Sequence, residues 1–228
     1  MELGRRLIAI AIYVIGSATF FLYIQAMAES QSTAVTRALQ AIKAGDVKLA
    51  LRLLDDVRDV NVDNAALFYE AVMHRQPEVI EKLFAKAADP NLRDDLLSTS
   101  LLNKWDSTTL LLLRHGANPN GHNPYGRLSP LSIASAQGNT AIMHALIDKG
   151  ADVDYNDYVG SGTPLTIAIE ENKLSAVQVL LDNAADPSIG AKFTGYPWDI
   201  AKNAKNKKIL DLLMRYRSNC KSEPQRCM

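Results

Sequence analysis

A short residue pattern recurs at constant spacing through the second half of the chain. Residues 112–120 return as 146–154 and again as 180–188, so the central alanine repeats every 34 residues. A period of this length is typical of proteins built from stacked supersecondary units, because one such unit cannot bury its own apolar face. We therefore expect the units to stack on one another.

A second element keeps the same period and predicts where each unit begins. Residues 129–134 match residues 163–168 after 34 positions, and residues 196–201 follow after another 33. In the first two copies a Ser or Thr suited to cap a helix precedes a Pro suited to its first position. Trp198 takes the place of Leu165, so we expect it in the core.

The remainder of each unit predicts a second helix. Gly138 and Asn172 tolerate the left-handed conformation that closes a helix. Apolar residues then return at helical spacing, as in 176–181. The four leucines at 110–113 fall within such a helix and are expected to be buried. Each unit is therefore a helix–turn–helix hairpin.

These two phased elements together resemble the ankyrin repeat. The resemblance rests on Thr163-Pro164-Leu165-x-x-Ala168, on Gly150-Ala151-Asp152-Val153 and on their common period. Earlier units are degenerate, with periods of about 30 residues, and Asp95-Leu96-Leu97 replaces Thr-Pro-Leu in the third. The resemblance implies an all-α, ankyrin-like solenoid of about six helix–turn–helix repeats over residues 33–217. The last unit, 196–217, carries the polar outside of a capping repeat.

The first 28 residues are expected to direct export. Arg5 and Arg6 precede residues 7–24, which carry no charge, and Ala26-Met27-Ala28 follows. This order is the pattern of a secretory signal peptide, cleaved here after Ala28. The 18 uncharged residues also reach the length of a spanning helix, so an uncleaved single-pass anchor in the inner membrane is the alternative. Both interpretations place the repeats in the periplasm of a bacterium.

The end of the chain differs from the body in cysteines and in charge. Residues 218–228 form a tail with Cys220 and Cys227, which we expect to close a disulfide in an exported protein; two free thiols are the alternative. Residues 29–191 hold 14 Lys/Arg against 21 Asp/Glu, whereas residues 192–228 hold nine against three. These are either two solvated surfaces of opposite sign or a basic end that meets anionic lipid or an acidic partner.

No motif indicates catalysis or metal binding. His74, His115, His122 and His144 have no Cys or His partner at metal-ligand spacing. The sequence contains neither a phosphate-binding glycine loop nor a nucleophile elbow. The formal net charge of zero argues against nucleic acid as a partner. We therefore expect a monomer that is no enzyme and holds no cofactor or metal.

The resemblance also implies a partner-binding surface. Ankyrin-like proteins usually bind through turn tips and through the exposed, concave face of the first helices. Carried over to this chain, three tips supply His122, Asn123, Tyr125, Arg127, Tyr155, Asp157, Tyr158, Lys192, Phe193 and Tyr196. Aromatic and Arg side chains are common anchors of interfaces, although Tyr in such turns can instead pack on the neighbouring tip. Gln137, Glu170 and Glu171 are expected on the adjacent helix face, where the two carboxylates favour a basic partner.

The expected function is a non-catalytic protein-binding module of the bacterial periplasm or envelope. Exported ankyrin-like proteins of bacteria include immunity proteins that neutralise secreted toxins such as phospholipases. Others assist periplasmic stress enzymes. The sequence leaves both roles open, since fold alone does not determine function.

Overall fold

The computed structural model describes residues 30–93, 95–121, 128–156, 162–192 and 195–220. These residues form helices and turns, and the only strand-like pairing among them is an isolated antiparallel bridge between Ala191 and Gly195. None of the helices they form is long and apolar enough to cross a membrane. The predicted export segment, and the side chains of Cys220 and Cys227, lie outside what the structure describes. The expected all-α class is confirmed for the described residues.

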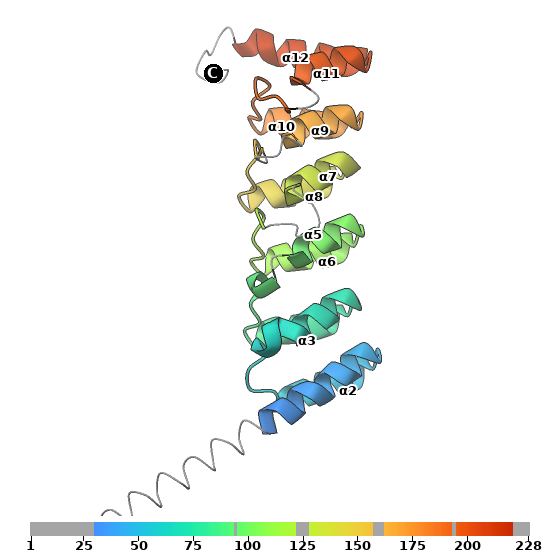
Figure 1. Ribbon diagram of the computed structural model, residues 1–228, viewed down its shortest axis with the longest axis vertical. Coiled ribbons are helices and arrows are strands. Elements are labelled where there is room, and N and C mark those ends of the chain that lie inside the picture. The colour runs from blue at the N-terminus through green and yellow to red at the C-terminus, as the bar shows by residue number, and fades with distance from the viewer. Residues whose placement is uncertain (1–29, 94, 122–127, 157–161, 193–194, 221–228) are drawn as a thin grey trace, which may run out of the picture. The chain divides into compact units, whose positions relative to one another are not determined.

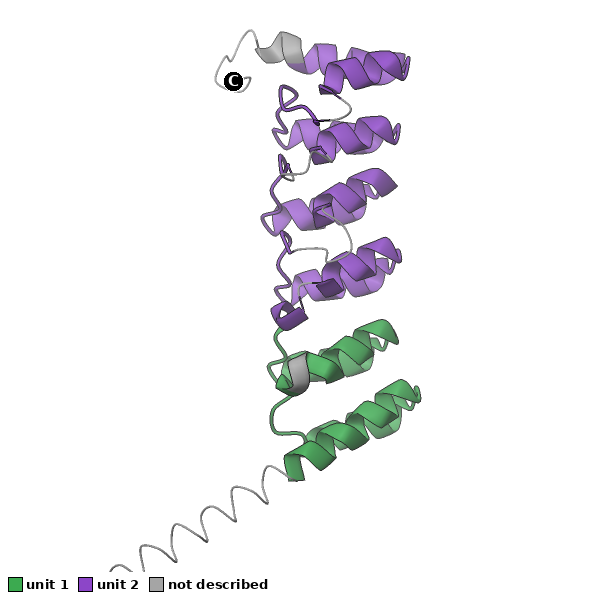
Figure 2. Cartoon of the chain, viewed as in Figure 1, with its two compact units in different colours: residues 1–89 green, residues 90–228 purple. Residues whose placement is uncertain are grey.

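The chain divides into two compact units, residues 1–89 and 90–228 (Figure 2). Unit 1 contains two helix pairs. The first pair is a helix over residues 30–43 and α2 (Val47–Leu53), which continues into the 3-10 turn η1 (Leu54–Asp56). The second pair is α3 (Val62–Met73) and α4 (Pro77–Ala85). α4 packs against both α2 and α3, and the fully buried Phe68 meets Phe84 edge to face at 5.0 Å between ring centroids.

Unit 2 opens with the 3-10 turn η2 (Pro90–Arg93) and continues with four helix pairs. Their bounds are α5 (Asp95–Leu102) and α6 (Asp106–Arg114), α7 (Pro130–Gln137) and α8 (Thr140–Asp148), α9 (Pro164–Glu170) and α10 (Leu174–Asp182), α11 (Pro197–Asn203) and α12 (Lys207–Cys220). The first helices stack in the order α5, α7, α9, α11, and the second helices in the order α6, α8, α10, α12 (Figure 1). Unit 2 is thus a helical repeat solenoid.

The predicted helix starts are confirmed where the pattern is complete. Ser129 Oγ accepts the N–H of Ser132 at 3.1 Å, and Thr163 Oγ1 accepts that of Thr166 at 3.3 Å. A proline occupies the first helical position after each cap, where no N–H is needed. Each first helix is therefore started by its own sequence, which fixes where the preceding tip ends.

α5 begins without this pattern, and an ion pair takes the place of the Thr-Pro start. Arg93 Nε lies 3.1 Å from Asp95 Oδ1, and Arg93 Nη2 lies 3.1 Å from Asp95 Oδ2. A two-pronged guanidinium–carboxylate pair is both strong and directional. It joins η2 to the first residue of α5, which explains how the departure from Thr-Pro-Leu is tolerated.

Two expectations about the core are wrong. Leu111, Leu112 and Leu113 are buried, but Leu110 is 39% exposed. Consecutive helical residues turn by about 100° each, so four in a row cannot all face one core. Trp198 is only half-buried, whereas Leu165 at the same position is fully buried. α11 belongs to the last helix pair that the structure describes, so no described pair packs on its outer side.

Candidate functional site

The structure describes three of the ten predicted partner-binding residues. The other seven lie outside the described residues: His122, Asn123, Tyr125, Arg127, Asp157, Tyr158 and Phe193. Tyr155 is half-buried, Lys192 is exposed, and Tyr196 is 58% exposed. The two described tips are neighbours, because Asn156 Nδ2 of one donates to the carbonyl of Gly190 in the other at 3.4 Å.

Tyr196 at the last tip lies against the chain's own backbone. Ala191 and Gly195 exchange backbone hydrogen bonds of 2.8 and 3.0 Å, which form an isolated antiparallel bridge beside it. A Cβ built on Gly190 would lie 2.9 Å from Cδ1 of Tyr196, so the ring lies directly against the Gly190 backbone. The aromatic side chain is therefore positioned before a partner arrives, which lowers the entropy lost on binding.

A row of asparagines ties each tip to the next. Asn120 Nδ2 donates to the carbonyl of Gly150 at 2.9 Å, and its Oδ1 accepts the N–H of Asp152 at 2.8 Å. Asn91 makes the same two bonds within unit 2, and Asn61 makes them within unit 1. An amide side chain suits this position, because its NH2 donates while its oxygen accepts. The sequence does not reveal these bonds, although Asn and Asp recur at the tips.

Asp154 occupies the equivalent position at the next tip, which we call the next rung, and makes only one of the two hydrogen bonds. Its Oδ1 accepts the N–H of Asp186 at 2.8 Å, but a carboxylate has no hydrogen to offer the carbonyl of Ala184. Burial raises the pKa of Asp154, and the nearby carboxylates of Asp186 and Asp152 raise it further, against the opposing effect of the Asp186 N–H. The junction between these two tips therefore carries a carboxyl group whose pKa lies above that of a free aspartate.

We expect Asp154→Asn to stabilise unit 2, by about 1 kcal/mol at about pH 7, because the amide completes the rung. The raised pKa means that the folded state holds the proton more tightly than the unfolded chain. The favourable contribution of protonated Asp154 is thus complete below the ordinary pKa of 3.8 and is lost as the pH rises through the folded-state pKa. The gain from the substitution should therefore shrink on acidification. Urea unfolding at several pH values measures it.

The reciprocal substitution Asn120→Asp serves as the control. It converts a complete rung into one like that of Asp154, so the urea midpoint should fall at about pH 7 and recover partly in acid. A pH-independent effect of Asp154→Asn, or no change in midpoint, would contradict the proposed role of the missing amide hydrogen.

On the exposed face of the first helices of unit 2, only some of the polar side chains bond to other parts of the chain. Gln137 is half-buried and donates through Nε2 to the carbonyl of Leu101 at 2.7 Å. Glu170 and Glu171 are exposed, as expected, and neither forms an ion pair within the described part of the chain. Leu102 is 48% exposed on α5, which sequence analysis missed because nothing in the pattern separates it from Leu101. This face offers both apolar and acidic contact.

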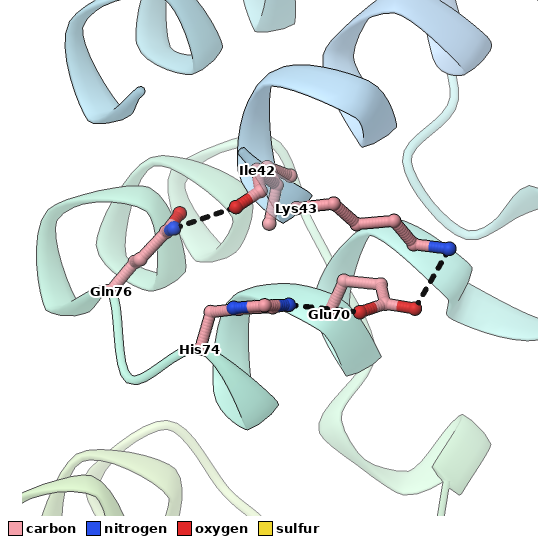
Figure 3. A network of polar contacts seen from close by, with 5 residues as sticks. All are labelled: Ile42, Lys43, Glu70, His74 and Gln76. Atoms are coloured by element: carbon pink, nitrogen blue, oxygen red, sulfur yellow. Dashed lines mark hydrogen bonds and ion pairs between the residues drawn. The ribbon is translucent and has the colours of Figure 1, made fainter. Parts of the chain in front are cut away.

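In unit 1 the corresponding region contains the polar contacts drawn in Figure 3, with Gln76 Oε1 left as a buried acceptor without a partner among the described residues. Glu70 lies between Lys43 Nζ at 3.2 Å and His74 Nε2 at 3.5 Å. Gln76 is buried and donates through Nε2 to the carbonyl of Ile42 at 2.8 Å. The sequence did not reveal this network, because Lys43 and Glu70 are 27 positions apart and only the stacking brings them together. The charges here are largely satisfied within the unit.

Tyr216 links the second helices of the last two pairs. Its hydroxyl donates to a carboxylate oxygen of Asp182 on α10, and Gln178 Nε2 donates to the same hydroxyl at 2.9 Å. Burial, together with Asp182, raises the pKa of Tyr216 to about 12. The phenol therefore stays protonated at physiological pH and acts as a fixed structural donor.

The exposed side chains that the structure describes are suited to packing and hydrogen bonding with another molecule. Within the described ranges, no three His, Cys, Asp or Glu residues are grouped so that they could hold a metal ion. The exposed groups at the tips and on the ends of the first helices include Tyr196, Lys192, Glu170 and Glu171. Such surfaces bind other proteins by packing and hydrogen bonding.

Comparison with known proteins agrees with this geometry. The family model of ankyrin repeats, in three copies, matches residues 100–191, which begin in α5 and end in the last described tip. A search of curated proteins found no match to the chain. Ankyrin repeats are generally non-enzymatic modules that bind another protein. The helix pairs, their period and the family match together support the ankyrin-repeat family, carried in this chain by residues 100–191.

Proposed function

We propose that this chain is an exported protein-binding module without catalytic activity, which acts in the bacterial periplasm or at the envelope. The binding surface is formed by the turn tips and by the exposed face of the first helices in unit 2. The observation that carries the proposal is Tyr196, an aromatic side chain 58% exposed yet supported by the backbone of Gly190. A large, exposed aromatic side chain that lies against the protein's own backbone is a common interface anchor.

Export is supported by the N-terminal pattern of Arg5, Arg6 and the uncharged residues 7–24. The intact mass of the protein recovered from an exporting host separates the two possible fates of this segment. A chain that begins at Glu29 is a periplasmic protein. A chain that retains residues 7–24 is a single-pass inner-membrane protein with its repeats in the periplasm.

Two roles fit such a module. One is an immunity protein that neutralises a secreted antibacterial toxin, for example a phospholipase. The other is a scaffold for a periplasmic stress enzyme. The partner itself separates these roles, because an inhibitor blocks the activity of its toxin whereas a scaffold leaves its enzyme active.

Truncation of the two tip tyrosines should weaken capture of the partner. We expect affinity capture of the C-terminally tagged protein from the native envelope fraction to recover one stoichiometric partner, identified by mass spectrometry. With Tyr155→Ala and Tyr196→Ala combined, recovery should fall at least tenfold, because loss of an interface anchor costs about 2 kcal/mol or more.

The matched control removes exposed apolar groups elsewhere in unit 2. Leu174 is 37% exposed on α10 and Met214 is 47% exposed on α12, and neither lies on a tip or a first helix. Leu174→Ala combined with Met214→Ala should leave capture unchanged. If the control abolishes capture and the tyrosine variant does not, the docking surface lies on the second helices and the tip assignment is wrong.

A further inference from the structure

The turn between α11 and α12, the last helix pair described in unit 2, is rich in lysine. Figure 1 shows the two helices. Lys202, Lys205, Lys207 and Lys208 fall within seven residues and are all exposed. Within the described part of the chain, none of the four forms an ion pair. We call these four residues the lysine corner.

Two of these lysines occupy positions that work against the helix they begin. Lys207 and Lys208 are the first two residues of α12, and its first turn contains no acidic residue. The N-terminal end of a helix carries partial positive charge, so cations there are unfavourable and carboxylates are favourable. α6 and α11 follow that rule with Asp106 and Asp199 in their first turns. Local departures from stability rules are expected where function requires them.

The equivalent corners of the preceding pairs show that the repeat does not require lysine here. The corner between α7 and α8 consists of Gln137, Gly138 and Asn139, none of them charged. The corner between α9 and α10 contains Glu170 and Glu171, with Lys173 the only cation. A capping repeat needs a polar outer face, which asparagine or glutamate supplies equally well. The lysine corner therefore exceeds what solubility of the last repeat demands.

The composition of the corner indicates the kind of surface it meets. Lysine is a compact charge on a flexible stem and lacks the planar, two-pronged geometry of arginine. Residues 202–208 include only Lys, Asn and Ala, so the corner's own residues supply no aromatic or bulky apolar anchor, and the aromatic one helical turn away, Trp198, is half-buried. Protein hot spots and stacked nucleic-acid bases both require such anchors. A diffuse layer of negative charge requires none, and anionic phospholipid headgroups form such a layer.

We propose that the lysine corner docks the C-terminal repeat on anionic phospholipid. Lys221 and Arg226 follow in the sequence and add two further cations to this end of the chain. The inference is separate from partner binding, because the tip tyrosines are not part of the corner. Each lysine near such a surface should raise the membrane partition coefficient about fivefold, and salt should reverse the effect.

The test uses the protein purified from the exporting host and two kinds of vesicle. One kind contains about one third phosphatidylglycerol in phosphatidylcholine, and the other is phosphatidylcholine alone. Co-sedimentation should show binding to the anionic vesicles in excess of the neutral ones, and this excess should vanish at about 0.5 M salt. Subtracting the binding to neutral vesicles removes the contribution of residues 7–24, should the purified protein retain them. The variant with all four corner lysines changed to Gln should lose this excess binding. At about fivefold per lysine, its partition coefficient on anionic vesicles should fall about a hundredfold or more.

A matched variant changes Lys48, Lys104, Lys149 and Lys173 to Gln and removes the same net charge. It should keep the excess binding, and an equal loss would show that overall charge, not the corner, is responsible. If the wild-type protein ignores anionic vesicles but binds immobilised polyglutamate, the corner serves an acidic protein and the lipid proposal is wrong.

Urea unfolding of the corner variant provides an independent readout. Removal of Lys207 and Lys208 from the start of α12 should leave the midpoint unchanged or slightly higher, because the two charges oppose the helix. A lower midpoint would show that the lysines stabilise the fold, and the proposal would lose its structural basis.

Discussion

Gly162→Ala is expected to destabilise unit 2 by about 2–5 kcal/mol, through strain and overpacking together. Gly162 is buried and has a φ of +98°, a backbone conformation that residues with a side chain rarely adopt. An added Cβ would lie 2.3 Å from Thr166 Oγ1 and 2.9 Å from Ala191 Cβ. Thr166 belongs to the capped first turn of α9, so it cannot move away without loss of that turn. Urea unfolding measures the loss, and amide exchange should locate it around α9 and the last tip.

Gly150→Ala separates the two causes. Gly150 has a φ of +89°, close to that of Gly162, but nothing lies within 4 Å of an added Cβ. This variant should therefore show the backbone penalty alone, about 1–2 kcal/mol. Equal losses in the two variants would show that the neighbours of Gly162 give way, and the close-packing argument would fail.

Phe68→Ala should destabilise unit 1 by about 3–5 kcal/mol, the usual loss for deletion of a buried aromatic. Phe68 is fully buried in α3, and its edge-to-face contact with Phe84 joins α3 to α4. Because repeats are stabilised mainly by their nearest neighbours, amide protection should fall first across α3 and α4. Protection in α9 and α10 should persist at urea concentrations that open unit 1.

Leu174→Ala is the surface control for this measurement. Leu174 is 37% exposed, so loss of its side chain should change the free energy of unfolding by no more than about 0.5 kcal/mol. If Phe68→Ala and Leu174→Ala lower the midpoint equally, Phe68 does not anchor the core of unit 1.

Local signals in the sequence predicted the helix starts and corners well. Ser129 and Thr163 cap the helices they were expected to cap, and Gly138 closes α7 with a φ of +74°. Pro77 is the first residue of α4, the position in a helix where proline costs no hydrogen bond. These features depend on hydrogen bonds and dihedral angles within a few residues, which the local sequence specifies.

Side-chain exposure was less predictable, because it depends on what packs against a helix. Leu110 and Leu111 are adjacent in one leucine run, yet only Leu110 is exposed to any large extent. Trp198 and Leu165 share one position in the repeat but differ in burial, because one lies in the last described pair and the other has a pair on either side. Periodicity locates a helix face but does not show whether a neighbour covers it.

In the candidate site, too, the sequence predicted the location of residues but not their contacts. The sequence singled out the tips, and Tyr196 proves to be exposed there. It could not show that the ring rests on Gly190, or that Asn156 joins one tip to the next. The lysine corner was visible only as an excess of positive charge near the C-terminus. Its place at the start of α12, opposed to the helix, emerged from the structure.

Local capping and apolar spacing encode the repeat, its period and the boundaries of most helices, so these can be predicted from the residues alone. The contacts between repeats depend instead on how the helix pairs stack. Asn120 meets Gly150, and Glu70 meets Lys43, across separations of about one repeat. Such contacts form because stacking sets distant residues side by side, and no local pattern encodes which atoms then face each other. The incomplete rung at Asp154 is therefore a property of the assembled stack, readable only once its neighbours are in place.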